Sequence, residues 1–363
     1  MASIFTKPIS AKTLKGEGPV IGLEIEAGSV GAVEASGDAV NAAVQPLPAE
    51  AFRDGEVVDP DSVAEALRAL FSEHKLSKRV RLGIGNQRVV ARTLRLPAIE
   101  NPGELDSAVR FAAQEQVAMP LDQAVVEHRV VGGVAGVEGA PPQIDVMVIA
   151  ARREMISATL KPLRDAGLEP VGVDLSAFGM IRALAGASGT GVNPGSEPAD
   201  GATLYCSAGD VTTLAIAKGR SCLFTRVSPV GLDQTVDRLV SSTEMSHEHA
   251  RMWLTHVGLE SPLETIEGDA ATAAQSRSAL ETGASSLLDE LRMSLDFYGA
   301  QEGAVPAQSV VLCGHGSAIP GLAQQLEQGL ALPVEVGRPQ ALAELDASQV
   351  ARLTLPLGLA MES

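Results

Sequence analysis

The sequence predicts an α/β protein with two lobes, and three observations support this prediction. The chain has 363 residues, whereas a single hydrophobic core stops growing at roughly 250 to 300 residues, so we expect two domains or one large bilobed unit. Hydrophobic residues make up 45% of the chain and aromatic residues only 3%, which indicates aliphatic cores built on helices and sheets. An apolar run that leads into a turn of small residues occurs three times, over residues 20–33, 203–217 and 310–322. Because such turns let backbone N–H groups approach a phosphate or sugar closely, the three could converge on one nucleotide.

The charge and the cysteine content argue against several classes of function. The formal net charge is −17, which repels phosphate groups, so we expect no nucleic-acid partner unless a local basic patch provides one. Cys206, Cys222 and Cys313 lie in apolar runs without metal-ligand spacing, which indicates reduced thiols in a cytosol and no metal site. Residues 1–18 lack the apolar core of a signal peptide and are expected to form a flexible arm. No run approaches the roughly 18 apolar residues that span a bilayer, so we expect no direct membrane insertion.

The first part of the chain has a regular order of strand and helix signals. Residues 20–33 and 39–47 read as two strands joined by a turn at 36–38. Asp59 is expected to cap a helix whose apolar side chains recur at helical spacing. Strands over 79–84 and 89–96 follow, so this part reads as strand, strand, helix, strand, strand.

A small α+β insert is expected over residues 96–167. Asn101 and Pro102 open a helix. Strands over 124–131 and 144–150 flank a loop rich in Gly and Pro. A further helix over 152–166 is expected to stop at Gly167.

A second lobe is expected after a linker. Residues 186–201 are rich in Gly, Pro, Ser and Ala without an apolar period, which predicts a flexible linker. Strands are expected over 204–217 and 223–230. Ser246 is a candidate N-cap for a helix over 247–256, and a long helix with one apolar stripe is expected over 284–298.

Two stretches carry a resemblance to a known family. They are LPAIENPGELDSAVRFAAQEQVAMPLDQAVVEHRVVG and VMVIAARREMISATLKPLRDAGLEPVGVDLSAFGMIRAL. Both are similar to the pattern of the type IV pilus assembly PilM family, within the actin-like ATPase superfamily, and the similarity runs from about residue 18 to about residue 338.

The resemblance implies a bilobed actin-like (ribonuclease-H-like) fold with an inserted α+β subdomain 1C, which PilM proteins share with the cell-division protein FtsA. Residues 19–95 and 168–185 would form subdomain 1A, with 339–363 as a segment that packs back onto it. Residues 96–167 would form 1C, and residues 202–338 would form the second lobe.

The first phosphate loop of the family reads like DIGSSSVK, with an Asp that organises metal and water, a Gly beside the phosphates, and a Lys. This chain has Glu24, Glu26 and Gly31 at those three positions and keeps Gly28 and Ser29 as candidate nucleotide contacts. Glu26 brings a second negative charge toward a polyphosphate, which costs electrostatic energy unless a metal intervenes.

The second phosphate loop of the family reads like VDIGASTTNL. Here Cys206 aligns with the metal-organising Asp, and a thiol is a poor ligand for Mg²⁺. Gly209, Thr212 and Thr213 remain as candidate contacts. Asp210 is displaced by four positions and is expected to face elsewhere, although a realignment with one gap would partly restore it.

The third turn of the family reads like SGGGALLPGL and contacts adenosine. Only His315 is unusual in this chain, and the helix expected from near Ile319 would present its N-terminus to the ligand. The candidate adenosine contacts are Gly314, Gly316, Ser317 and Pro320.

The resemblance implies a cytoplasmic scaffold of type IV pilus assembly with a degenerate nucleotide site and no catalytic residues, because the altered loops are those that would hold metal and γ-phosphate. Proteins of the family bind the short cytoplasmic N-terminus of the inner-membrane protein PilN in a groove between 1A and 1C, and link the pilus motor complex to the membrane. A PilN-like peptide is therefore the expected partner, and it would hold the protein at the inner face of the cell membrane. We expect the groove to draw on residues 79–96, the helix face over 109–119 and the strand near Val171, since peptide capture on a sheet edge needs no catalytic residue.

The alternative is an FtsA-like ATPase that binds ATP with Mg²⁺ and hydrolyses it or polymerises. A third hypothesis is that the chain is a secretion-system member of the same superfamily. This hypothesis is disfavoured because no transmembrane segment is predicted. Micromolar, metal-dependent binding of an ATP analogue would favour the ATPase over the scaffold.

Overall fold

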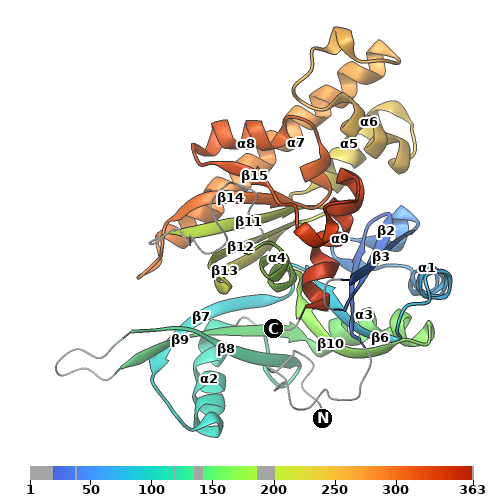
Figure 1. The fold of residues 1–363 in the computed structure, drawn as a ribbon. Coiled ribbons are helices and arrows are strands. Elements are labelled where there is room, and N and C mark those ends of the chain that lie inside the picture. Colours follow the sequence, from blue (N-terminus) through green and yellow to red (C-terminus); the bar gives the residue numbers. More distant parts are fainter. Residues whose placement is uncertain (1–18, 37–38, 118, 135–141, 186–200, 362–363) are drawn as a thin grey trace.

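The computed structural model describes residues 19–36, 39–117, 119–134, 142–185 and 201–361. The expected arm over 1–18 and almost all of the expected linker over 186–201 lie outside these residues. Figure 1 shows a second lobe above the first, with a small three-stranded sheet to one side of the first lobe.

Two five-stranded sheets form the centres of the two lobes, and they have the same plan. The first sheet has the order β10-β6-β1-β2-β3 and the second the order β13-β12-β11-β14-β15. In each sheet the central strand, β1 or β11, pairs antiparallel with two successive strands on one side and parallel with two on the other. The strands of the first sheet are β1 (Ile21–Glu26), β2 (Ser29–Ser36), β3 (Ala39–Pro46), β6 (Arg79–Ile84) and β10 (Glu169–Leu175). Those of the second are β11 (Ala202–Ala208), β12 (Thr212–Lys218), β13 (Ser221–Ser228), β14 (Ala307–Cys313) and β15 (Val334–Val336).

Two of the expected single strands are hairpins, so the prediction of one strand over 20–33 and one over 204–217 is wrong. The first run reverses at Ala27 and Gly28, where Gly28 has a φ of 86° and Glu26 pairs with Ser29. The second run reverses between Ala208 and Thr212. Because both faces of each sheet are covered, the apolar pattern continues through the turn, and a reversal of two or three residues leaves little trace in the sequence.

The inserted subdomain consists of an antiparallel sheet and one helix. Its strands are β7 (Val90–Pro97), β8 (Ala124–Val134) and β9 (Gln143–Arg152), in the order β7-β9-β8, and α2 (Pro102–Gln116) covers one face with a separate small core. The next helix, α3 (Arg153–Asp165), packs instead against α1 (Pro60–Glu73) and β10 of the first lobe. We therefore propose residues 90–152 as the insert, in place of 96–167.

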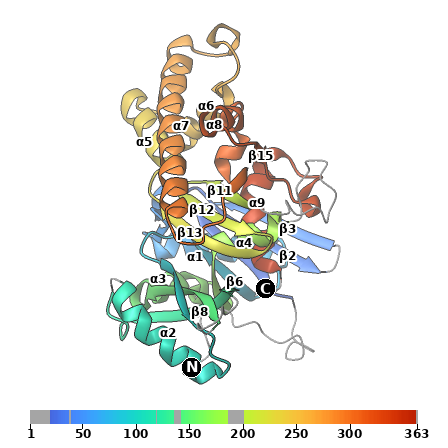
Figure 2. The same ribbon diagram turned by 90° about the vertical axis from the view of Figure 1, so that its left-hand side faces the viewer.

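Helices of the second lobe cover one face of its sheet. They are α5 (Leu232–Thr243), α6 (His247–Val257), α7 (Ala270–Gly299) and α8 (Leu322–Leu330). Figure 2 shows α7 as a long rod along one side of this lobe. The expected start at residue 284 is wrong: Asp269 caps the helix by accepting a hydrogen bond from the Thr272 N–H at 2.7 Å. The first part of α7 buries small side chains such as Ala273 and Ser276, which give a weak apolar period.

The C-terminal helix α9 (Ala347–Ala360) crosses the first sheet and α4 (Ser176–Leu184) at very short range. A Cβ atom on Gly22 would lie 1.9 Å from the Pro356 carbonyl oxygen, and one on Gly358 would lie 1.7 Å from the Gly179 carbonyl oxygen. Gly31 also lies beneath α9, where a Cβ atom would be 2.8 Å from the Arg352 carbonyl oxygen. Small residues at these crossings are therefore required by packing.

Two buried arginines hold the end of α9. Arg81 donates to the Leu359 carbonyl oxygen at 2.7 Å, and Arg182 donates to the Gly358 carbonyl oxygen at 2.7 Å. Arg182 also pairs with Asp174 at 2.6 Å. Positive charge at a helix C-terminus satisfies the last carbonyl groups and opposes the negative end of the helix dipole.

The remaining short elements complete the description. They are β4 (Phe52–Arg53), β5 (Glu56–Val57) and the 3₁₀ turns over Ala49–Ala51, Leu263–Thr265, His315–Ala318 and Gln340–Leu342. All three cysteines are buried free thiols. In the described part of the chain, every helix is too short or too polar to cross a membrane.

Replacing Gly22 by Ala is expected to lower the free energy of unfolding by about 1–3 kcal/mol, because the added methyl group meets backbone of α9 that cannot move aside cheaply. The control is Gly299→Ala at the end of α7, where a Cβ atom meets nothing within 4 Å. Urea unfolding measures both variants. Equal stability of the two would contradict the close crossing.

Candidate functional site

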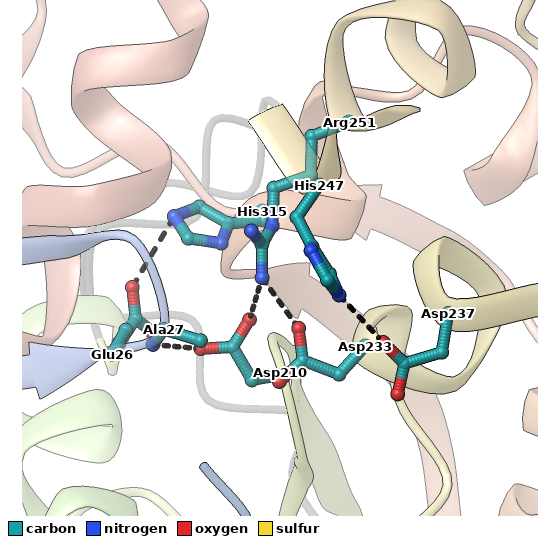
Figure 3. Close-up of polar contacts among 8 residues, drawn as sticks. All are labelled: Glu26, Ala27, Asp210, Asp233, Asp237, His247, Arg251 and His315. Atoms are coloured by element: carbon teal, nitrogen blue, oxygen red, sulfur yellow. Dashed lines mark hydrogen bonds and ion pairs between the residues drawn. The ribbon is translucent and has the colours of Figure 1, made fainter. Parts of the chain in front are cut away.

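Three turns meet where the two lobes face each other. They are the β1–β2 turn at Ala27 and Gly28, the β11–β12 turn around Asp210, and the turn after β14 that carries His315. β1 and β11 hold the same position in their sheets, so their C-terminal ends point at one another across the cleft. Helices α5 and α6 of the second lobe add charged side chains beside the turns, as Figure 3 shows.

Asp210, on the second lobe, contacts the first lobe through its side chain. One carboxyl oxygen accepts a hydrogen bond from the Ala27 N–H. The other lies 3.5 Å from Nη2 of Arg251, which also pairs with Asp233. Burial, and then the charges of Asp233 and Glu26, raise the pKa of Asp210. The expectation that Asp210 faces elsewhere is wrong, because the short turn aims its side chain back across the cleft.

Glu26 and His315 make a second contact between the lobes. His315 Nε2 lies 3.3 Å from Oε2 of Glu26, and their side chains keep 12% and 16% of their surface exposed. Burial and the nearby Glu24 charge raise the pKa of Glu26 to about 8, against the opposing effect of Arg352 and Arg251. Burial, with the charges of Arg352 and Arg251, lowers the pKa of His315 to about 3. Both groups are therefore neutral at pH 7, and the contact avoids the cost of burying charge.

Glu24 lies deeper, at the base of the same cleft. Its Oε1 accepts a hydrogen bond from the Ser176 hydroxyl at 2.6 Å, while Oε2 has no hydrogen-bond partner among the described residues. Burial raises the pKa of Glu24 to about 7, although the bond from Ser176 opposes the shift. A Cβ atom on Gly83 would lie 1.9 Å from Oε2, so the glycine makes room for the carboxyl group.

The space that remains between the turns is small. Its volume is about 30 Å³, and its walls include Glu24, Glu26 and Asp210. This is room for about two water molecules. Any ionised carboxyl group in these walls would repel a phosphate. In the described ranges, no group of three His, Cys, Asp or Glu side chains is placed to hold a metal ion.

Cys206 does not face the cavity. Its side chain is fully buried in the hydrophobic core of the second lobe. The walls of the cavity include its neighbour Ser207 and Thr213 on the paired strand, because side chains alternate between the faces of a strand. The alignment of Cys206 with the metal-organising Asp of the family stays a prediction.

The candidate nucleotide contacts fall into two groups. Gly28, Ser29, Gly209 and Thr213 lie at or beside the cleft. The others are engaged within the second lobe. The Thr212 hydroxyl donates to the Val230 carbonyl oxygen.

The third turn is packed against the end of β11. Cβ atoms on Gly314 and Gly316 would lie 2.6 Å from the Ser207 hydroxyl and 2.7 Å from the Ala208 Cβ. The Ser317 hydroxyl donates to the Gly314 carbonyl oxygen at 2.7 Å, and the Pro320 carbonyl oxygen accepts from the Leu259 N–H at 2.7 Å. The helix after this turn begins at Leu322 rather than near Ile319. Contact of these residues with a nucleotide stays a prediction.

Arg251 and Asp233 are the cleft residues that sequence reasoning missed. Arg251 lies on α6, and a Cβ atom on Gly28 would be 3.6 Å from its Nη1. Asp233 lies in the first turn of α5. Both lie on amphipathic helices whose charged residues look like an ordinary solvated face, and no motif marks them.

A larger groove lies between the first lobe and the insert. Its volume is about 670 Å³. The walls come from β5, β7, the end of β9, α3 and Met119 after α2, and they combine apolar with charged side chains. Ten residues line it: Glu56, Val57, Arg88, Val90, Met119, Arg152, Glu154, Met155, Ala158 and Thr159.

Comparison with known proteins places the chain among actin-like folds. The model of a family described as type IV pilus assembly protein PilM matches residues 22–363. A solved PilM-PilN type IV pilus biogenesis complex contains a chain that is 26% identical, with a TM-score of 0.77, and the match covers 94% of this chain and 98% of that one.

More distant structures show the fold alone. The ethanolamine utilization protein EutJ from Carboxydothermus hydrogenoformans is 13% identical with a TM-score of 0.52, over 99% of this chain and 93% of that one. MreB5 of Spiroplasma citri bound to ADP is 13% identical with a TM-score of 0.54, over 94% of each chain. The predicted actin-like α/β fold is thereby confirmed.

Stability is expected to fall as the pH rises from 6.5 to 8. Folded Glu26 keeps its proton up to about pH 8, whereas unfolded Glu26 loses it near 4.5, so the unfolded state binds fewer protons in this window. The lowered pKa of His315 makes stability rise with pH instead, but only below the ordinary histidine pKa of 6.5. The loss is on the order of 1 kcal/mol, and Glu26→Gln should reduce it. Urea unfolding at both pH values measures the slope, and an unaltered slope in the variant would contradict the assignment.

Proposed function

We propose a function for this chain on the premise that it belongs to the type IV pilus assembly protein PilM family. The chain is an actin-like protein of type IV pilus assembly. Its specific task is to act as a scaffold that binds the short cytoplasmic N-terminal peptide of a PilN-like inner-membrane protein. Through that partner it lies at the inner face of the cell membrane and links the pilus motor complex to it.

The observation that carries this proposal is the groove of about 670 Å³ between the first lobe and the insert. The similar solved chain comes from a complex that contains PilN. Of the segments expected to form a peptide groove, residues 79–96 supply Arg88 and Val90, and the segment after α2 supplies Met119. Residues of α3 and β5 complete the walls in place of the strand near Val171.

The chemistry of the groove suits an extended peptide. Val57 and Val90 belong to strands that lie at the edges of their sheets, β5 and β7, and an edge strand offers backbone groups for pairing. Met119, Met155 and Ala158 add apolar surface, and methionine adapts to varied side chains. Arg88, paired with Glu56 at 2.8 Å, places charge at the rim. An apolar peptide flanked by polar residues matches this arrangement.

Replacing Ala158 by Arg is expected to weaken binding of a synthetic PilN-like N-terminal peptide by at least about tenfold, since the added side chain fills the groove from an exposed position on α3. The peptide is to be taken from a neighbouring reading frame that encodes a small protein with one transmembrane helix. Fluorescence anisotropy measures the affinity.

The matched control is Ser157→Arg, which adds the same charge and volume on an exposed position of α3 outside the groove lining. It should bind like the unaltered protein. Equal affinity of both variants would place the peptide elsewhere, and no binding by the unaltered protein would overturn the scaffold proposal.

A second part of the proposal is that the nucleotide site is degenerate. Glu26 and Asp210 stand where phosphates would lie, and the small cavity between the turns supports this. MreB5, with the same fold, has been solved with ADP, so the fold itself allows nucleotide. For this chain we propose that ATP with Mg²⁺ binds weakly and is not turned over.

Titration with a fluorescent ATP analogue and Mg²⁺ is expected to give a dissociation constant above about 100 μM, equivalent to less than about 5.5 kcal/mol of binding. The affinity is expected to be low because two carboxyl groups would lie beside the phosphates in a space with little water. Micromolar affinity that disappears with a chelator would favour the FtsA-like ATPase instead.

A further inference from the structure

The Ala27 N–H and the Arg251 guanidinium form a pair of donors at the mouth of the first turn, which we call the cleft donor pair. The amide belongs to a tight turn in which Gly28 has a φ of 86°. The guanidinium comes from the other lobe and lies beside Gly28. A backbone N–H at such a turn with a cation next to it is a binding place for an anionic oxygen.

Asp210 occupies this place with both of its carboxyl oxygens. One accepts from the Ala27 N–H, and the other lies near Nη2 of Arg251. The same Nη2 also pairs with Asp233, whereas Nη1 of Arg251 lies beside Gly28. The side chain keeps 5% of its surface exposed, so the donors are screened from solvent by the protein's own residue. Because Ala27 belongs to the first lobe and Asp210 to the second, the occupied pair also joins the lobes (Figure 3).

The turn that carries Asp210 is held in a fixed position. The Leu232 N–H donates to the Gly209 carbonyl oxygen at 2.9 Å, and a Cβ atom on Gly231 would lie 2.1 Å from the Asp210 carbonyl oxygen. The start of α5 thus packs directly on the turn. Such backbone contacts preorganise the carboxyl group, so little entropy is lost when it meets the donors.

A second contact acts in the same direction. Oε2 of Glu26 and Nε2 of His315 approach to 3.3 Å beside the turn. Nε2 of His315 makes no hydrogen bond among the described residues, so this contact is one of packing between two buried groups. The lobes are therefore joined at two neighbouring points by side chains from both.

We propose that Asp210 acts as a built-in ligand, which takes the place of an external anionic oxygen at the cleft donor pair and keeps the two lobes closed without nucleotide. This goes beyond the scaffold function and does not depend on the peptide groove. The consequence is a cleft whose closed shape is independent of nucleotide, and a donor pair that becomes available to small phosphates when the carboxyl group is removed.

The test is Asp210→Ala, with inorganic pyrophosphate as the probe. Hydrogen exchange of the Ala27 amide should accelerate by about tenfold, the effect of losing one hydrogen bond to a carboxyl oxygen. Calorimetry should detect pyrophosphate binding by the variant and none by the unaltered protein. Unchanged protection of Ala27, or the absence of pyrophosphate binding by the variant, would overturn the proposal.

The matched control is Asp237→Ala, which makes the same substitution on the neighbouring helix α5. Asp237 pairs with His247 at 3.0 Å outside the cleft donor pair, so the variant should keep normal Ala27 exchange and bind no pyrophosphate. If Asp210→Ala does not fold, Asp210→Leu keeps a similar volume but removes both acceptor oxygens. Its Ala27 amide should also exchange several-fold faster, and exchange at the original rate would overturn the proposal.

The same samples separate this inference from the scaffold function. Asp210→Ala should bind the PilN-like peptide with unchanged affinity, because the groove between β7 and α3 includes neither Asp210 nor Ala27. If the unaltered protein does not bind the peptide, only the scaffold function is contradicted. The role of Asp210 is then still tested by the hydrogen exchange of Ala27.

Discussion

The contact of Asp210 with the Ala27 N–H joins the ends of the two central sheets, beside a hydrophobic core that the two lobes share. It exists because β1 and β11 hold the same place in two sheets of the same plan, so that their terminal turns face one another. Once the turns meet, Glu24, Glu26 and Asp210 are brought together in a nearly dry space. Their raised pKa values follow from that confinement.

A second constraint fixes the first lobe beneath this contact. Helix α9 crosses β1, β2 and α4 at distances that only glycine permits, at Gly22, Gly31 and Gly358. The sequence pattern suggests that Gly31 marks the loss of a lysine, but the structure gives it a packing role below Arg352. Residues that differ from a family pattern can therefore be set by neighbouring helices as much as by a lost ligand.

Much of the fold could be predicted from the sequence. The three small-residue turns and the family resemblance led to the bilobed actin-like arrangement, and Asp59, Asn101 and Ser246 cap helices as expected. The hairpins were missed because sheets buried on both faces continue their apolar pattern through a tight turn. The early part of α7 was missed because its buried residues are small.

The candidate site was predicted less well, for a geometric reason. A shift of one position along a strand moves a side chain to the other face, and this shift separates Cys206 in the core from Ser207 in the cleft. The direction of Asp210 depends on the conformation of a short turn, and Arg251 reaches the cleft from a distant helix. Neither relation has a local pattern that a sequence could reveal.

Small-angle X-ray scattering with and without a large excess of ATP and Mg²⁺ tests most directly whether the cleft is closed by the protein's own side chains. The account predicts the same radius of gyration in both samples, because the lobes are already joined at Asp210 and Glu26. A more open molecule that becomes compact only when nucleotide is added would contradict it.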